Sequence, residues 1–139
     1  MTRTVTTDPP FGEVIFQYTR AQAIADGVLI DASELAREAG FCYPVAFTAA
    51  VWEDCVAWDD TDSKQQIHQD LTGRLWDVLL LAAHGARSAK PGHERVAYEI
   101  DRVPRDGSST RAETTVLHMM IGPGDNAEPV ITILQPHED

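Results

Sequence analysis

The clearest pattern in the chain is a row of apolar residues that recur at helical spacing. These residues are Ile67, Leu71, Leu75, Val78, Leu79 and Ala82. The spacing predicts one long amphipathic helix from about Lys64 to Arg87. Because so wide an apolar face must be buried, we expect this helix to lie against the core of the protein.

Shorter helices are predicted ahead of it from their terminal residues. They are Arg20–Asp26, Ala32–Ala39 and a third that begins at Pro44 or Thr48 and ends near Val56. Thr19 and Asp31 stand at the N-cap positions of the first two, where a side-chain oxygen can accept from a free backbone N–H. Gly27 and Gly40 follow them, and glycine readily takes the left-handed conformation that ends a helix.

The period of the pattern changes from 3.6 to 2 after Pro91-Gly92, which predicts strands. Val96, Tyr98 and Ile100 share one face of the first strand, and Asp106-Gly107 is a strong hairpin signal. Two further strands are predicted at Thr114–Ile121 and Val130–Leu134. The predicted fold is therefore α+β, with short N-terminal helices and the long helix packed on a three-stranded antiparallel meander.

The length of 139 residues is that of one domain. Residues 1–11 are rich in Thr and Pro and are predicted to be a flexible leader, while residues 12–136 form the single domain. Residues 12–18 are rich in β-formers and indicate a short strand or an extended segment. The apolar triplet Val28–Ile30 indicates a brief strand or a buried turn.

Composition narrows the class of protein. The N-terminal segment lacks the basic and then apolar pattern of a signal peptide, and the longest apolar run, Val78–Ala83, is too short to cross a bilayer. Two cysteines do not make a disulfide framework. We therefore expect a cytoplasmic protein that does not enter the membrane.

Negative charge is unevenly distributed along the chain. The formal net charge is −11, with −8 over residues 1–62, +2 over residues 63–105 and −5 over the remainder. A negative field repels phosphate backbones and anionic lipids, so we expect no direct binding to nucleic acid and a basic protein surface as partner. The predicted contact residues are Glu53, Asp54, Trp58, Asp59, Asp60 and Asp62.

Arginines gather near the predicted hairpin turn. Arg102, Arg105 and Arg111 lie close together in sequence, and they could either bind an anion or pair with the acidic N-terminal half. The acidic residues around Asp60 do not match a calcium-binding loop, because position six is Gln65 where an EF-hand needs glycine.

A small enzyme is the alternative function. Its polar site would lie between the long helix and the sheet and would use Asp77, His84, His118 and Arg105. A metal site of His84, His118 and a cysteine lacks any zinc-binding spacing, so we expect no metal and no cofactor.

Core packing is the favoured interpretation of both cysteines. Cys42, near a predicted helix start, is nevertheless the better candidate nucleophile, while Cys55 lies on an apolar helix face. A homodimer through the last strand, Val130–Leu134, is a third possibility, because that strand has apolar residues on both faces and would be an edge of the meander.

Several strings resemble a family of small uncharacterised bacterial proteins that are often encoded on plasmids and mobile elements. The strings are Tyr18–Asp31, Glu38–Trp52, Gly73–Leu79, Val103–Gly107 and Ile121–Pro136. The resemblance implies a stand-alone bacterial domain with an accessory role in host interaction or DNA maintenance. It implies no activity and assigns no catalytic residue.

Overall fold

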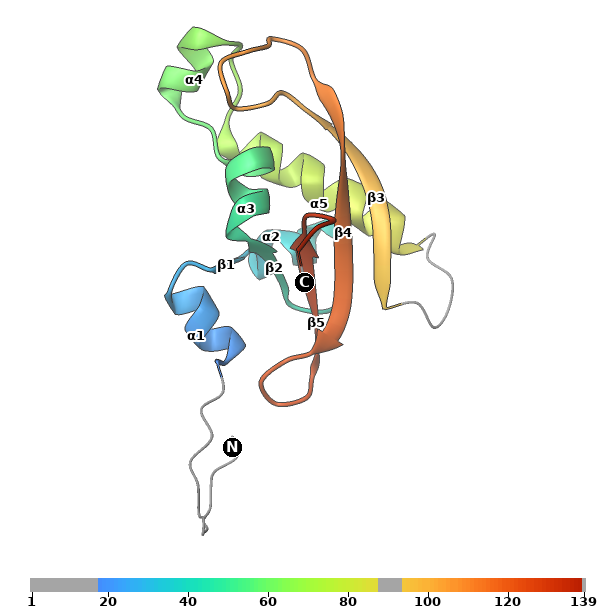
Figure 1. Ribbon diagram of the computed structural model, residues 1–139. Coiled ribbons are helices and arrows are strands. Elements are labelled where there is room, and N and C mark those ends of the chain that lie inside the picture. Colours follow the sequence, from blue (N-terminus) through green and yellow to red (C-terminus); the bar gives the residue numbers. More distant parts are fainter. Residues whose placement is uncertain (1–17, 88–93, 139) are drawn as a thin grey trace, which may run out of the picture.

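The computed structural model describes residues 18–87 and 94–138, which form one mixed sheet and a set of helices (Figure 1). The helical elements are α1 (Arg20–Ala25), α2 (Ser33–Ala39), α3 (Ala49–Val51), the π-helical turn η1 (Trp52–Val56), α4 (Asp60–Gln65) and α5 (Leu71–Arg87). The strands are β1 (Leu29–Asp31), β2 (Val45–Thr48), β3 (Arg95–Arg102), β4 (Glu113–Pro123) and β5 (Pro129–Leu134). The predicted leader, residues 1–11, lies outside the described residues, as do residues 12–17 of the predicted extended segment.

The sheet has five strands, in the order β1-β2-β5-β4-β3. The strands β3, β4 and β5 pair antiparallel, as the sequence predicts. The predicted three-stranded antiparallel meander is nevertheless wrong, because β2 adds to β5 in parallel and β1 adds to β2. The α+β class is retained, but the sheet is larger and mixed.

The strand that the sequence pattern missed is β2. Its residues Val45, Ala46 and Phe47 are fully buried, because β2 lies between β1 and β5 in the interior of the sheet. A strand buried on both faces shows a continuous apolar run rather than alternation, and such a run resembles the start of a buried helix. The predicted third helix is therefore confined to α3 and η1.

The same topology places β5 in the middle of the sheet. It pairs with β2 on one side and β4 on the other, so the expectation that Val130–Leu134 forms an edge strand is wrong. The apolar residues on its two faces serve the interior of this molecule instead. The edges of the sheet are β1 and β3.

The predicted long helix is interrupted. Helix α4 ends at Gln65 and α5 begins at Leu71, and the segment between them is held by polar contacts. The Gln66 amide donates to the carbonyl oxygens of Pro104 and Ser109 at 2.8 and 2.5 Å. Asp70 accepts from the Gly73 N–H at 2.6 Å and so caps the start of α5.

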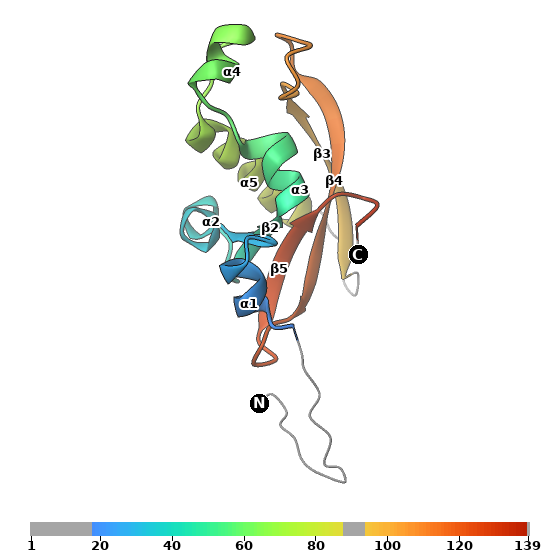
Figure 2. The same cartoon turned by 60° about the vertical axis from the view of Figure 1, so that its left-hand side comes forward.

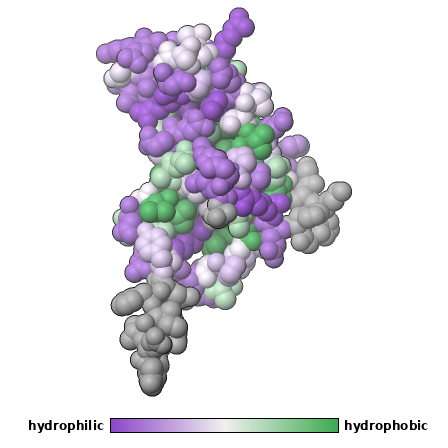
Figure 3. Space-filling model, viewed as in Figure 1, coloured by the Kyte–Doolittle hydropathy of each residue, from purple (hydrophilic) through white to green (hydrophobic). Residues whose placement is uncertain are grey.

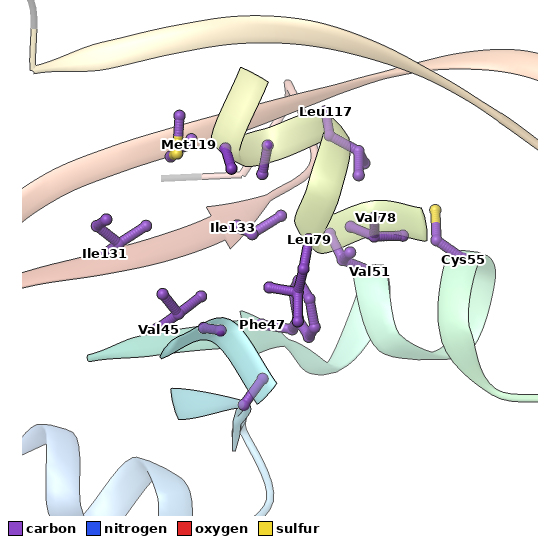
Figure 4. Close-up of a cluster of buried hydrophobic side chains, with 14 of the residues drawn as sticks. Val45, Phe47, Val51, Cys55, Val78, Leu79, Leu117, Met119, Ile131 and Ile133 are labelled. Carbon is purple, nitrogen blue, oxygen red and sulfur yellow. The ribbon is translucent and has the colours of Figure 1, made fainter. Parts of the chain in front are cut away.

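Figure 2 shows α2, α3 and α5 on one side of the sheet. The buried core lies between these helices and the sheet, and α5 packs mainly against β3 and η1. Figure 4 shows the centre of this core, where Phe47 of β2 and Leu79 of α5 lie close together, with Ile133 of β5 nearby. Because α5 is packed into this core, its first turn is held at the end of the molecule where α4 and the β3–β4 connection lie.

Candidate functional site: an acidic segment bound by three arginines

Three arginines hold the acidic segment 53–62 against the rest of the protein. Arg105 lies in the β3–β4 connection, Arg102 ends β3, and Arg74 lies in the first turn of α5. Figure 1 shows the β3–β4 connection beside α4 at one end of the molecule. Figure 3 shows that hydrophilic residues cover this end.

Arg105 makes three ion pairs. Its Nε donates to Asp62 at 2.7 Å, Nη1 to Glu53 at 3.1 Å and Nη2 to Asp59 at 3.2 Å. Asp59 and Asp62 are already fixed by the capping box at the start of α4, in which each accepts from the backbone N–H of the other. One guanidinium therefore joins η1, α4 and the β3–β4 connection.

The ion pairs shift the pKa values of both partners. The hydrogen bond to Asp62 raises the pKa of Arg105 above its usual value. Desolvation raises the pKa of Asp62, but the hydrogen bonds from Arg105 and from the Asp59 amide outweigh it, and the net pKa is lowered. The pair is therefore charged at neutral pH.

Arg102 pairs with Asp54 at the base of the same region. Its Nη2 lies 3.1 and 3.2 Å from the two carboxylate oxygens, and the exposed fractions of the two side chains are 16% and 31%. The neighbouring Cys55 thiol is buried, and burial together with the Asp54 charge raises its pKa to about 12. Cys55 is consequently a protonated core residue rather than a nucleophile.

Arg74 is buried, with only 4% of its surface exposed. Its donors reach the carbonyl oxygens of Asp54, Val56 and Val103 and the side-chain oxygen of Gln69, at 2.8 to 3.2 Å. Two of these carbonyls belong to the last turn of η1, so the guanidinium also caps the negative end of that turn. Its carbon Cζ lies 4.5 Å from the ring centroid of Trp58, a cation–π contact.

An open groove of about 590 Å³ lies on the exposed side of these arginines. Its walls are formed by Ala50, Glu53, Asp54, Asp62, Arg102, Pro104, Arg105, Asp106 and Glu113. Five carboxylates and two guanidiniums give this lining a formal charge of −3. Such a groove attracts cationic groups and repels anionic ones.

The structure brings most of the predicted contact residues together. Glu53, Asp54, Asp59 and Asp62 surround Arg102 and Arg105. The side chains of Glu53 and Asp59 remain 69% and 59% exposed.

Two further predicted contact residues differ in exposure. Asp60 is exposed at the start of α4. Trp58 is 6% exposed and donates from Nε1 to Ser63 at 3.0 Å, so its ring faces the protein rather than the surface.

The residues of the predicted enzyme site do not meet. Asp77 and His84 are exposed on α5, whereas His118 lies on the opposite face of the sheet, beside Ala97. There His118 accepts at Nδ1 from Arg95 Nε at 2.7 Å, and desolvation and the Arg95 charge lower its pKa. Arg105 lies in the separate acidic groove.

The other sequence hypotheses can be placed as well. Cys42 is exposed, which contradicts its interpretation as a core residue, and Cys55 is buried as expected. Across residues 18–87 and 94–138, no three His, Cys, Asp or Glu side chains are grouped closely enough to hold a metal ion. No helix in these ranges has the length and apolar character needed to cross a membrane.

Pairing of arginines with the acidic half was one of two alternatives from the sequence, and the structure confirms it for Arg102 and Arg105. The role of Arg74 was missed. In the sequence it occupies a polar position in a helical pattern, where an exposed arginine is the common outcome. The contact between Arg74 and Trp58 gave no signal in the sequence, since the two residues lie 16 positions apart in the chain.

Comparison with known proteins places the chain in a family but gives no activity. The sequence profile of a family of unknown function, DUF6573, matches residues 10–139. The chain belongs to this family. No curated protein and no solved structure matches the chain.

Proposed function

We propose that this member of DUF6573 is a non-enzymatic binding protein that contacts a basic protein surface through the acidic groove. The observation that carries the proposal is the groove lining, with five carboxylates against two arginines. The resemblance to proteins of bacterial plasmids and mobile elements supports an accessory role in such an element. We place that role in the cytoplasm.

The ion pairs support this function by fixing the shape of the groove. Arg105 neutralises part of the charge but leaves Glu53 and Asp59 largely exposed. Asp106 and Glu113 add exposed carboxylates from the β3–β4 connection and from the start of β4. A partner lysine or arginine would therefore meet carboxylates held in place before binding, which reduces the entropy lost on association.

The net charge supports a protein partner rather than nucleic acid. A chain with a formal charge of −11 and a groove lining of −3 repels a phosphate backbone at long range. The same field increases the association rate of a positively charged protein, and this gain falls as salt is added.

Two double variants test the proposal. Asp106→Asn with Glu113→Gln removes two groove charges that make no ion pair with Arg102 or Arg105. Glu34→Gln with Glu38→Gln removes the same charge from the exposed face of α2, outside the groove lining, and is the matched control. Each protein is immobilised and exposed to lysate of its native host, and retained proteins are identified by mass spectrometry.

The expected result is a basic protein retained by the wild type and by the α2 variant, and about tenfold depleted on the groove variant. Equal retention by all three proteins, or retention of acidic proteins alone, would contradict the proposed function.

A further inference from the structure

A second groove, the apolar groove, lies between α1, β1, the start of α3 and the turn that follows β5. Its volume is about 590 Å³, and its lining is mostly apolar, whereas five carboxylates line the acidic groove. Figure 3 shows hydrophobic surface below the hydrophilic end of the molecule. The lining of the apolar groove includes Tyr18, Asp26, Val28, Ala49, Ala50 and Glu138.

The two most exposed large apolar side chains among the described residues both line this groove. The exposed fraction is 60% for Tyr18 and 51% for Val28, and no other large apolar side chain in the described ranges exceeds 43%. Both residues are held in place. The Tyr18 hydroxyl donates to Asp26 at 2.8 Å, and the backbone of Val28 is bonded to Ala23 and Ala49. Apolar groups that are already fixed lose little entropy when a partner covers them, which favours binding.

The charge of the apolar groove is negative. Asp26 and Glu138 supply two carboxylates, and no Lys or Arg is among the described residues that line the groove. Asp26 accepts from the Tyr18 hydroxyl, and Glu138 accepts from Thr48 Oγ1 and from the Gln135 N–H, each at 2.8 Å. These donors are neutral, and within the described part of the chain neither carboxylate forms an ion pair. The groove therefore favours a group that combines an apolar side chain with positive charge.

The apolar groove is continuous with the acidic groove, because Ala50 lines both of them. Ala50 is exposed in α3, and Glu53 and Asp54 follow it by three and four positions, so the three side chains share one helical face. One surface therefore runs from the apolar groove along α3 and η1 to the carboxylates. A partner that binds the carboxylates reaches the apolar groove within about one helical turn.

We propose that the basic partner of the acidic groove also places a large apolar side chain in the apolar groove, against Tyr18 and Val28. This inference rests on the proposed function and specifies the partner further: its basic residues lie beside an exposed large aliphatic or aromatic side chain. Burial of that side chain supplies affinity that salt does not weaken, whereas the charge pairs increase the association rate.

Selection from a random peptide library displayed on phage tests the proposal. The bait is the full chain, as wild type and as three variants. Val28→Ser changes the apolar groove, and Asp106→Asn with Glu113→Gln changes the acidic groove. Val116→Ser is the matched control, because Val116 is 38% exposed on β4 and lines neither groove. Since both valines are exposed, neither substitution opens a cavity in the core.

The wild type and Val116→Ser should enrich peptides that carry several Lys or Arg residues together with a large apolar residue. Val28→Ser should keep the basic preference and lose the apolar one, and the acidic-groove variant should do the reverse. Basic peptides without an apolar preference on the wild type, or an apolar preference that Val28→Ser leaves intact, would overturn this inference alone. Absence of a basic preference on the wild type would overturn the proposed function and this inference with it.

A peptide enriched on the wild type is then compared, by fluorescence anisotropy, with the same peptide in which the apolar residue is alanine. On the wild type this change should weaken binding about tenfold, at low salt and at about 0.5 M NaCl alike. On Val28→Ser the two peptides should bind within about twofold of each other. A difference of the same size on both proteins would place the apolar side chain elsewhere and overturn the proposal.

Other occupants of the apolar groove would give different results. A second copy of the chain would make the wild type dimeric in sedimentation, and Val28→Ser would dissociate the dimer. The chain's own residues before Tyr18 would compete for the groove, so the apolar preference would appear only after Ile15→Ser with Phe16→Ser. Either result would overturn the proposal.

Discussion

Arg74 and Arg105 bind the same acidic segment in opposite ways. Arg74 lies at its buried base and uses neutral carbonyl and amide oxygens together with an aromatic ring. Arg105 lies at its rim, where its side chain is 25% exposed, and uses three carboxylates, of which those of Glu53 and Asp59 are largely exposed. Burial, rather than the number of ion pairs, determines how much each contributes to stability, since water screens the rim but not the base. We therefore expect the buried base, at Arg74, to stabilise the fold, and the rim, at Arg105, to fix the positions of the surface carboxylates.

The largest expected effect is the loss of the buried guanidinium. Arg74→Ala leaves the carbonyl oxygens of Asp54, Val56 and Val103 without their donor and opens a cavity beside Trp58. We expect the free energy of unfolding to fall by about 3–5 kcal/mol, measured by urea denaturation. A loss below about 1 kcal/mol would show that the base does not hold the fold.

A smaller effect is expected from the ring that covers Arg74. Trp58→Phe keeps an aromatic face but removes the Nε1 donor to Ser63 and weakens the cation–π contact. The unfolding free energy should fall by about 1–2 kcal/mol. Wild-type stability in this variant would mean that neither the hydrogen bond to Ser63 nor the full cation–π contact stabilises the fold.

At the rim, Arg105→Gln removes three ion pairs and should still cost less than about 1 kcal/mol. The loss should shrink between low salt and 0.5 M NaCl, because salt screens the exposed carboxylates that then repel each other. An equal loss at both salt concentrations would indicate that the rim is less accessible to water than its exposure implies.

The smallest effect is in the pH dependence. The pKa of Asp62 is lowered in the folded protein, so its contribution to stability is present above the unfolded pKa of about 4 and is lost as pH falls through the folded pKa. Urea denaturation between pH 6 and pH 3 should show a slightly steeper loss of stability in the wild type than in Arg105→Gln. An equal loss of stability with falling pH in the two proteins would show that Arg105 does not lower the pKa of Asp62.

Local signals in the sequence predicted the elements whose formation is local. Thr19 forms a capping box with Gln22 at α1, and Gly40 ends α2 with a φ of 107°. Asp106-Gly107 lies in the connection that joins β3 to β4, and Gly107 has a φ of 78°. Asp31 is an exception, because it belongs to β1 and bonds to Ser33 while Ala32 takes the N-cap position.

Long-range pairing could not be predicted from these signals. The parallel pairing of Val45 with Ile131 joins residues 86 positions apart, and nothing local specifies it. Similarly, the sequence shows Arg74 only as a polar position of a helix. Its burial depends on bonds to η1 and to the β3–β4 connection, which lie far from it in the chain. The acidic cluster was visible in the sequence, but the arginines that bind it lie 12 or more positions away in the chain.

One conservative substitution, made at both arginines, separates the buried base from the rim most directly. Lysine keeps the charge but cannot reproduce the planar set of donors or the stacking on Trp58. Urea denaturation of Arg74→Lys should show a loss of about 2–4 kcal/mol, and that of Arg105→Lys a loss below about 1 kcal/mol. Equal losses, or a larger loss at Arg105, would contradict the division between a buried base and an exposed rim.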